Sequence, residues 1–506
     1  MTDSLKASTE GLTIIDQARK RRGWTKTSTA CWWQDAHTSR ATLRRFWRGE
    51  RIQKEAFIGI CQAVGVSNWE AIAQSVESSI TNVPELNSPL IDWNEAPDIE
   101  HFYGRTQELN QLEQWMTTDN CQLVVIMGMG GIGKTALALA LTDRIQSEFE
   151  CIIWRSLVHD SSLANLLDSL LNAFEQKTLK NVMSSIAKLI EHLEKRRCLL
   201  ILDGLDVVWH RVKDRKKYRE YNAFLRALSF HNQSCILITS SEPLPKWEDI
   251  VARSQQVRCL TLQGLPPAEA LMLLQAGGFT GKEPGLKALS KLYRGNPLAL
   301  KTITPLIKSL FGGDVKKFLF QNTLVVGDRL QVLLTEQFNR LSESERSIVY
   351  WLAIWQEPIS LYRLQTHWLN LSDPSVIWQG IAALESRSLL EKHFSTDEPS
   401  FTLQPMVMKV VTEKLVEQAQ REISKVVRTS DIQHFKLLRT HWLLRPGTDD
   451  IAGDLILSQL QEQLWLKYGS ALPQTLSEIF PLLKEQPPLV VGYINCNLVA
   501  LFNQIV

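Results

Sequence analysis

Short apolar runs alternate with amphipathic segments between about residues 100 and 262. The runs are near-continuous, and helical periodicities separate them. Such runs are typical of strands that are buried on both faces of a parallel sheet. The five predicted strands are 121–127, 151–154, 198–202, 235–239 and 257–262. We therefore expect an α/β domain whose sheet is covered by helices on both sides.

Helical patterns dominate the rest of the chain. Residues 11–75 read as short helices, and three prolines among residues 81–98 indicate a linker. From residue 264 onwards the patterns are again helical, apart from a short predicted hairpin within 331–418. Because 506 residues exceed what a single core usually accommodates, we expect a multidomain fold of the α/β plus α class.

The composition narrows the class of protein. Hydrophobic residues make up 44% of the chain and charged residues 22%, which is typical of globular domains. The eight cysteines are scattered and form no Cys-x-x-Cys pair, so the sequence predicts buried thiols rather than disulfides or a zinc site. No apolar run is long enough to cross a bilayer, and the first residues lack a signal-peptide pattern. We expect a cytoplasmic protein without a membrane partner.

The segment GMGGIGKT, residues 128–135, carries the most specific chemical signal. It matches G-x-x-x-x-G-K-[ST] between a predicted strand and an amphipathic helix. Glycines let the backbone turn so that N–H groups surround an anion at the positive end of the helix. The lysine would reach the β- and γ-phosphates of ATP or ADP, and the threonine would bind Mg²⁺. The candidate nucleotide-binding residues are Gly128, Met129, Gly130, Gly131, Ile132, Gly133, Lys134 and Thr135.

Two acids follow the predicted strand 198–202. A carboxylate such as Asp203 rarely follows a buried run unless it meets a cation or lies at the rim of the sheet. We therefore predict that Asp203 holds the magnesium ion together with Thr135. Asp206 could orient the attacking water or cap the next helix, and the sequence leaves both roles open. Asp203 and Asp206 are the candidate catalytic residues.

Seven segments occur in the order found in NB-ARC ATPases, a family of STAND-type signalling switches that includes plant disease-resistance proteins and the apoptosome scaffold. The segments are FYGRTQEL, GMGGIGKT, FECIIWRSL, LLILDGLDVVW, ILITSSE, LQGLPPAEA and GNPLAL. The chain resembles this family over about residues 100–415. The implied domains are 1–78, basic and helix-turn-helix-like; 79–99, a linker; 100–262, P-loop nucleotide-binding; 263–330, helical; 331–418, winged-helix; and 419–506, a helical tail.

The resemblance also implies a mechanism. Members of the family are compact when ADP is bound, and exchange for ATP opens them, often with formation of a homo-oligomer. By the same resemblance, Gly104 and Arg105 would lie near the adenine and ribose, and Pro297 would pack on the base. Relatives usually continue into ligand-sensing repeats. The tail ends in an apolar helical pattern, so the sequence suggests that such a sensor is missing here.

Three departures from the family pattern concern catalysis. Gly204 stands where many members have a second acid. Ser240 and Ser241 follow Thr239, where an arginine usually senses the γ-phosphate. Gln404 occupies the position of a histidine that touches ADP, and an amide can donate a hydrogen bond to phosphate but brings no charge. We therefore expect slow hydrolysis or none.

Positive charge is concentrated near the N-terminus. Residues 19–54 contain eleven Lys and Arg against two Asp and Glu, whereas the whole chain has a formal net charge of +2. A helix is predicted within 38–52, with arginines spaced four residues apart on one face. The candidate contact residues are Arg40, Arg44, Arg45 and Arg48. This helix could enter a DNA groove, meet an acidic protein partner, or be a solvated surface.

Three functions remain open from the sequence. The first is a signalling ATPase that uses nucleotide exchange as its switch and the basic N-terminal segment as effector. The second is a transcription regulator in which nucleotide gates DNA binding through residues 11–75. The third is a nucleotide-binding scaffold that does not hydrolyse ATP.

Overall fold

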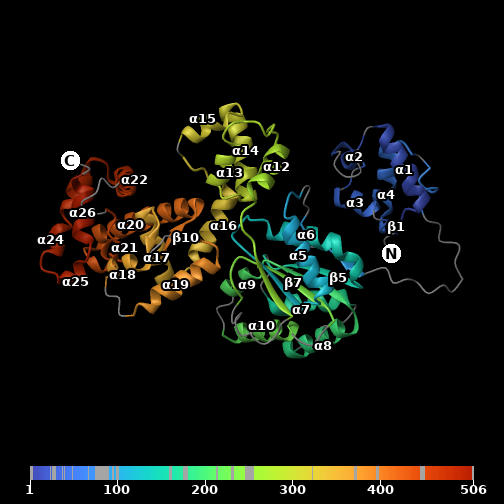
Figure 1. Cartoon of the computed structure of the whole chain (residues 1–506), viewed down its shortest axis with the longest axis horizontal. Coiled ribbons are helices and arrows are strands. Elements are labelled where there is room, and N and C mark those ends of the chain that lie inside the picture. The colour runs from blue at the N-terminus through green and yellow to red at the C-terminus, as the bar shows by residue number, and fades with distance from the viewer. Residues whose placement is uncertain are drawn as a thin grey trace. The chain divides into compact units, whose positions relative to one another are not determined.

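The computed structural model divides into two compact units, 1–86 and 87–506 (Figure 1). The residues that it describes are 4–22, 24, 30–36, 38, 40–47, 49–66, 68–73, 90–93, 96–97, 102–158, 162–174, 181–211, 215–229, 233–244, 256–321, 323–369, 373–394, 398–444 and 451–503.

The first unit consists of short helices around a small aromatic core. Its elements are β1 (Ser4–Leu5), α1 (Thr9–Arg21), α2 (Ala30–Asp35), α3 (Arg40–Trp47), β2 (Ile52–Gln53) and α4 (Lys54–Ala63). Strands β1 and β2 pair antiparallel. Trp32, Phe46 and Phe57 are fully buried, because the amphipathic faces of α2, α3 and α4 meet there. The helix-turn-helix assignment stays a prediction.

A six-stranded sheet forms the first part of the second unit. Its strands are β3 (Leu90–Asp92), β4 (Leu123–Met127), β5 (Cys151–Ser156), β6 (Cys198–Asp203), β7 (Cys235–Ser240) and β8 (Val257–Thr261). The strand order is β3-β5-β6-β7-β4-β8, and every pairing is parallel. The five strands expected from the apolar runs are therefore confirmed. The sixth, β3, lies inside the segment 79–99 that we expected to be only a linker, and it pairs with β5 at the edge of the sheet.

Helices cover both faces of this sheet, as the sequence predicts (Figure 1). One face packs against α5 (Thr106–Glu113), the π-helical η1 (Gln114–Thr118) and α6 (Lys134–Ile145), which continues into η2 (Gln146–Glu148). The other face packs against α7 (Leu163–Ala173), α8 (Val182–Lys195) and α10 (Arg215–Leu228), and α9 (Asp206–Arg211) follows β6. Strands β4, β5, β6 and β7 are buried almost throughout because neither face meets water.

Helices and one small sheet form the remainder of the second unit. The first group is α12 (Pro267–Ala276), α13 (Leu286–Leu292), α14 (Pro297–Phe311) and α15 (Val315–Phe320). The next elements are α16 (Asp328–Asn339), α17 (Glu343–Trp355), β9 (Ile359–Ser360), α18 (Leu361–Thr366), α19 (Ser375–Ser386), β10 (Leu390–Phe394), β11 (Pro399–Leu403) and α20 (Pro405–Thr429). Strands β10 and β11 form the expected hairpin, and β9 pairs with β11. The winged-helix assignment itself stays a prediction.

The tail is helical, in agreement with its sequence pattern. Its elements are η3 (Ile432–His434), α21 (Leu437–Thr440), α22 (Ile451–Tyr468), η4 (Gly469–Ala471), α23 (Leu472–Ser477), α24 (Phe480–Leu483), α25 (Pro488–Val491) and α26 (Ile494–Asn503). These helices share one continuous core with α12–α20.

Two of the expected boundaries fall within helices, whereas the boundary at 78/79 lies outside the described residues; the domain limits stay predictions. Helix α16 begins at Asp328, so the boundary at 330/331 cuts a helix. Helix α20 runs to Thr429 and crosses the boundary at 418/419, because its apolar stripe continues without a break. Hydrophobic periodicity continues across these boundaries, so the sequence gives no signal there.

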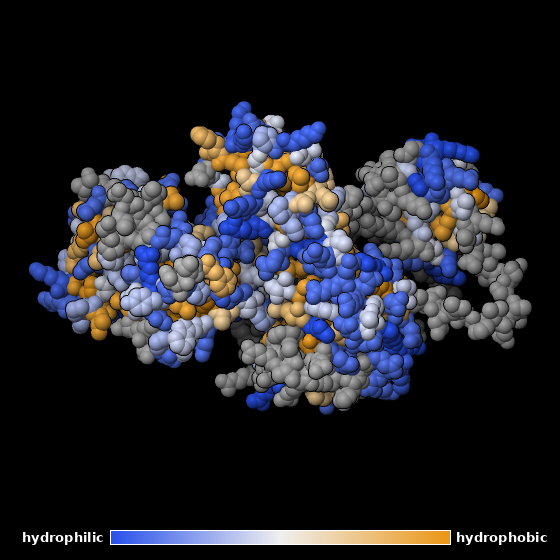
Figure 2. All heavy atoms as spheres, viewed as in Figure 1, coloured by the Kyte–Doolittle hydropathy of each residue, from blue (hydrophilic) through white to orange (hydrophobic). Residues whose placement is uncertain are grey.

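Most of the face shown in Figure 2 is hydrophilic. Apolar atoms gather over the α12–α15 segment, where Leu310 and Phe320 are exposed. Seven cysteines within the described residues are free thiols; five are buried, as the sequence predicts, whereas Cys259 is half-buried and Cys496 is exposed. None of the described helices is both long and apolar enough to cross a membrane.

Candidate functional site

The phosphate loop connects β4 to α6. Gly128, Gly131 and Gly133 have φ angles of 152°, 76° and 101°, which favour glycine over any residue with a side chain. Space is restricted too, because a Cβ atom on Gly131 would lie 2.9 Å from the Cβ atom of Leu298. The loop leads directly into the N-terminus of α6, so its N–H groups and the helix dipole favour an anion at the same point.

Lys134 is the first residue of α6 and is folded back over the loop. Its ammonium group donates hydrogen bonds to the carbonyl oxygens of Gly128 (2.7 Å) and Met129 (3.1 Å) and to Ser241 Oγ (3.0 Å). Burial lowers the pKa of Lys134 to about 8, although Asp206 and Asp203 oppose this shift. The three hydrogen-bond partners of this buried ammonium group are uncharged oxygens. A phosphate bound beside it would therefore form a strong, charge-assisted hydrogen bond.

Thr135 and Asp203 lie side by side at the end of the sheet. Thr135 Oγ1 donates to Asp203 Oδ1 at 2.8 Å, and Thr239 Oγ1 donates to the same oxygen at 2.6 Å. Burial raises the pKa of Asp203, although the hydrogen bonds from Thr239 and Thr135 and the charge of Lys134 oppose this shift. A hydroxyl and a carboxylate are the hard oxygen ligands that Mg²⁺ prefers, so the two residues fit the predicted ion.

Asp206, the first residue of α9, makes a contact that the sequence did not indicate. Its Oδ2 accepts a hydrogen bond at 2.7 Å from the guanidinium group of Arg340, which follows α16. Its Oδ1 accepts one from the N–H of Ser241 at 3.0 Å. Both side chains of the ion pair are largely buried, with 6% of Asp206 and 12% of Arg340 exposed. The water-orienting role of Asp206 stays a prediction.

The ion pair belongs to a larger charge network, which we define as Asp206, Arg340, Glu242, Arg387 and Glu345. Arg340 also lies 3.6 Å from Glu242, a residue that follows β7. Arg387, at the end of α19, lies 3.5 Å from Glu242 and 3.2 Å from Glu345 on α17. The network therefore joins the carboxyl edge of the parallel sheet to helices α16, α17 and α19.

Arg105 ties three segments together near the same loop. It has a left-handed conformation (φ 63°), and only 3% of the residue is exposed. Its guanidinium group donates to the carbonyl oxygens of Ile132 (3.3 Å) and Gln263 (2.7 Å) and pairs with Glu108. Gly104 precedes it at φ 71°, where a Cβ atom would collide with Glu269. Arg105 thus braces the phosphate loop, and its contact with a nucleotide stays a prediction.

Pro297 is brought to the loop by the segment before α14. Asn296 donates from Nδ2 to the carbonyl oxygen of Gly130 at 3.1 Å and caps α14 through Ala299. Pro297 begins that helix, as the missing N–H of proline allows. A Cβ atom on Gly133 would lie 3.9 Å from Pro297 Cγ, so Pro297 stands beside the loop.

Gln404 lies on a cavity of about 290 Å³ next to the loop, which Met129, Ile132 and Asn296 also line. Its side-chain amide donates to the carbonyl oxygen of Ser388 at 3.0 Å. The structure therefore brings Gln404 close to the phosphate loop, with its amide engaged by protein. Its hydrogen bond to phosphate stays a prediction.

Sequence reasoning missed Arg340, Glu242 and Arg387. Arg340 stands 134 residues from Asp206, and no local pattern around it indicates a partner at the end of the sheet. The sequence gives one indication of such a residue: no arginine follows strand β7, which leaves a place at the end of the sheet for a cation from another segment. A pairing at this sequence separation becomes visible only when the helices are packed.

The N-terminal arginines are less fully described. The side chains of Arg40 and Arg44 and the whole of Arg48 lie outside the described residues. Arg45 is exposed, pairs with Glu50 at 3.3 Å and donates to the carbonyl oxygen of Arg51. On the same helix, Leu43 and Phe46 are buried, as the predicted amphipathic pattern requires.

Comparison with known proteins agrees with this geometry. Residues 105–283 match the NB-ARC domain. The chain is 32% identical to an uncharacterized WD repeat-containing protein of Nostoc sp., over 99% of this chain and 46% of that protein. It is 27% identical to a probable disease resistance protein of Arabidopsis thaliana, over 44% of this chain and 12% of that one. A STAND protein with a tetratricopeptide repeat sensor from Pyrococcus horikoshii is 18% identical, with a TM-score of 0.31 and coverage of 82% and 59%.

A parallel sheet, a glycine loop at a helix N-terminus and a threonine–aspartate pair define a P-loop nucleotide-binding protein. Within that class, residues 105–283 match the NB-ARC domain. It spans less than half the length of the curated relatives named above.

Proposed function

We propose that the protein is a STAND-type signalling ATPase that binds ADP or ATP at the phosphate loop and uses their exchange as a conformational switch. The observation that carries this proposal is the ion pair between Asp206 and Arg340, because it links the phosphate site to helices outside the sheet. A switch needs a contact whose strength differs between the two nucleotide states.

The ion pair of Asp206 and Arg340, near Lys134, would be such a contact. Asp206 and Arg340 are both close enough to Lys134 to influence its pKa. A γ-phosphate placed beside Lys134 would repel Asp206 and attract Arg340, so ATP would weaken their pair, whereas ADP would leave it in place. Loss of the pair would weaken the charge network that holds α16, α17 and α19 to the edge of the sheet.

Slow hydrolysis or none follows from the same arrangement. Thr135 and Asp203 would hold Mg²⁺, which would neutralise phosphate charge when bound. Arg340 contacts Asp206 and Glu242 rather than the phosphate loop. Ser241 lies where the family usually has an arginine, and it accepts a hydrogen bond from Lys134. Few positioned charges would therefore stabilise the transition state. Assembly into a homo-oligomer in the ATP-bound form is part of the proposal.

The decisive experiment identifies the nucleotide that the purified protein carries. We expect the denatured wild type to release ADP or ATP. Lys134→Ala should retain none, because the ammonium is the strongest phosphate partner in the loop. Lys316→Ala, at an exposed position on α15, is the matched control and should retain nucleotide like the wild type. If the wild type releases no nucleotide and none binds in titration, the proposal fails.

A second measurement separates the switch from a passive scaffold. Subunit mass in solution is compared for protein loaded with ADP and with ATP, and single-turnover hydrolysis is followed in parallel. The switch requires a larger assembly or a measurable opening with ATP. Equal mass and equal protease sensitivity in both states would indicate the scaffold.

A further inference from the structure

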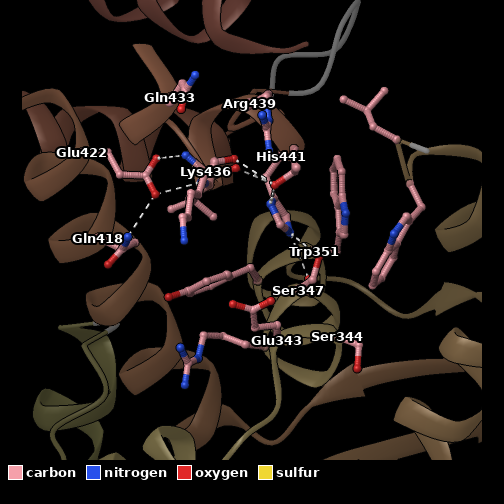
Figure 3. Close-up of a pocket in the computed structure, with 16 residues that line it drawn as sticks. Glu343, Ser344, Ser347, Trp351, Gln418, Glu422, Gln433, Lys436, Arg439 and His441 are labelled. Carbon is pink, nitrogen blue, oxygen red and sulfur yellow. Dashed lines mark hydrogen bonds between the residues drawn. The ribbon is translucent and has the colours of Figure 1, made fainter. Parts of the chain in front are cut away.

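A second cavity, of about 870 Å³, lies away from the phosphate loop (Figure 3). Its walls come from α17, from the turn after α18, from α20, and from the segment between η3 and His441. None of the residues that line it also lines the cavity beside the phosphate loop. The volume is within the range of pockets that hold small organic ligands.

One part of this cavity is aromatic and fixed. The rings of Trp351 and His441 lie 4.9 Å apart at an angle of 36°, and Tyr350 meets His441 edge-on at 5.8 Å. The imidazole is held by Ser347, whose carbonyl oxygen lies 3.0 Å from Nε2, and by Thr440 at 2.9 Å from Nδ1. Burial lowers the pKa of His441 to about 4, so the ring is neutral and packs as an aromatic surface.

The wall formed by residues 433–440 carries positive charge, on Lys436 and Arg439. Within the part of the chain that the structure describes, neither the ammonium group of Lys436 nor the guanidinium group of Arg439 has an ion-pair partner. Nε of Arg346, on α17, is likewise buried without a hydrogen-bond partner there. Figure 3 shows Lys436 and Arg439 on one wall and Ser344 and Ser347 on the α17 wall.

Two acids also line the cavity, Glu343 at the start of α17 and Glu422 on α20, and the second does not offset those cations. Glu422 accepts hydrogen bonds from the backbone N–H groups of Lys436, Leu437 and Leu438 and from Gln418. Burial raises the pKa of Glu422, although these donors oppose the shift. Its carboxylate therefore orders the start of α21 and is already satisfied. The lining therefore carries three cations, Arg346, Lys436 and Arg439, against the one further acid, Glu343, together with largely buried aromatic rings.

We propose that this cavity binds a small organic anion that carries a planar ring. Lys436 and Arg439 hold its phosphate or carboxylate group, and the ring packs against Trp351. An anion supplies the charge that these cations lack, and the partly exposed ring of Trp368 in the lining adds aromatic surface for the ring of the ligand.

The position of the cavity gives the ligand a regulatory role, which rests on the function proposed above. The first turn of α17 contributes Ser344, Arg346 and Ser347 to the cavity. The same turn contributes Glu345 to the charge network through Arg387, and it starts three residues after Arg340. An occupant that draws α17 towards α21 therefore acts on the contact that holds the switch closed.

Calorimetric titration with two probes tests the site. The probes are adenosine 5′-monophosphate and 1-naphthoate, a planar phosphate and a planar carboxylate. Titrations use Lys134→Ala protein, so that the phosphate loop does not contribute. We expect at least one probe to bind more tightly than about 1 mM. The probe that binds identifies the anionic group.

Matched charge reversals make the result specific. The double variant Lys436→Glu/Arg439→Glu changes side chains that have no partner among the described residues, and it should weaken binding roughly tenfold or more. Lys316→Glu/Lys317→Glu, on α15, carries the same change of charge and should bind like the parent. The site is disproved if neither probe binds, or if both double variants bind equally well.

The regulatory role has its own readout. In wild-type protein, a saturating concentration of the binding probe should change the rate of ADP release, and the Lys436→Glu/Arg439→Glu variant should lose this change. An unchanged rate despite binding would overturn the regulatory role and leave the site in place. Failure of the wild type to carry nucleotide would refute the function proposed above, while the titration still decides the site.

Discussion

Arg340 donates a hydrogen bond to Asp206 at 2.7 Å, across 134 residues of sequence. Asp206 belongs to the edge of the parallel sheet that carries the phosphate loop, and Arg340 belongs to the helices that follow. Both side chains are largely buried, so neither can exchange its partner for water without cost. This pair links the carboxyl edge of the sheet to the helices that follow it.

Removal of Arg340 should loosen that link. Arg340→Ala leaves Asp206 buried without its cation and leaves Glu242 with Arg387 alone, and we expect a loss of roughly 3 kcal/mol in the free energy of unfolding. ADP should also dissociate faster, because α16 no longer closes on the site. Stopped-flow release of a fluorescent ADP analogue and urea unfolding measure the two effects.

Two further variants give this prediction its control. Arg329→Ala, on the exposed face of the same helix, should change neither quantity. The double variant Asp206→Ala/Arg340→Ala should be less destabilised than the sum of the single variants, with a coupling of about 1–3 kcal/mol. Strict additivity would show that the two side chains do not interact in solution.

Nucleotide affinity should fall above pH 8. In the nucleotide-free protein the pKa of Lys134 is lowered to about 8, and the charged ammonium is the form that binds phosphate. At pH 7 the group is mostly protonated, whereas at pH 9 it is mostly neutral, so binding must take up a proton. We expect affinity to be roughly tenfold weaker at pH 9 than at pH 7, measured by calorimetry in two buffers of different ionisation enthalpy. Equal affinity at both pH values would contradict the lowered pKa.

The helices around His441 should lose stability in mild acid. The pKa of His441 is lowered from about 6.5 to about 4 by burial, so the unfolded chain binds a proton between these values and the folded chain does not. The contribution is intact above pH 6.5 and is lost as the pH falls towards 4. Between pH 7 and pH 5 we expect a loss of about 2 kcal/mol from this residue.

Urea unfolding of the wild type and of His441→Gln, followed by tryptophan fluorescence, tests this contribution. The amide of glutamine can replace the hydrogen bond to Ser347 and does not titrate. The variant should therefore show a smaller decrease between pH 7 and pH 5. An identical decrease in both proteins would assign the acid sensitivity to other groups.

The basic N-terminal unit should bind an anionic partner in a salt-dependent way. If the partner is duplex DNA, the plot of log affinity against log salt concentration should have a slope of about −0.9 for each phosphate contacted. The triple variant Arg40→Ala/Arg44→Ala/Arg48→Ala should lose this binding while nucleotide affinity stays unchanged. Arg45→Ala is a useful comparison, because Arg45 already pairs with Glu50.

The two partners that the sequence leaves open differ in this assay. Tight, sequence-dependent binding to DNA would favour the transcription regulator. Weak binding that ignores sequence would count against it and leave an acidic protein partner or a solvated basic surface.

The sequence alone determined the sheet and the phosphate loop. An apolar run such as 198–202 is stable as a strand that is buried between two layers of helices. The local spacing of its residues is enough to identify it. Gly128–Thr135 is likewise a local pattern, because the glycines, the lysine and the threonine act within one turn and one helix start. The pair of Thr135 and Asp203 could be anticipated because parallel strands end at a common edge.

Tertiary structure decided which groups surround that loop. The pairing of Asp206 with Arg340, the bracing of Ile132 by Arg105 and the cavity beside His441 each join residues that are far apart in sequence. The strand Leu90–Asp92 escaped detection for a related reason, since three residues are too few to show periodicity. Such contacts depend on how helices pack against one another, and helix packing depends on side-chain shape across the whole core rather than on any local pattern.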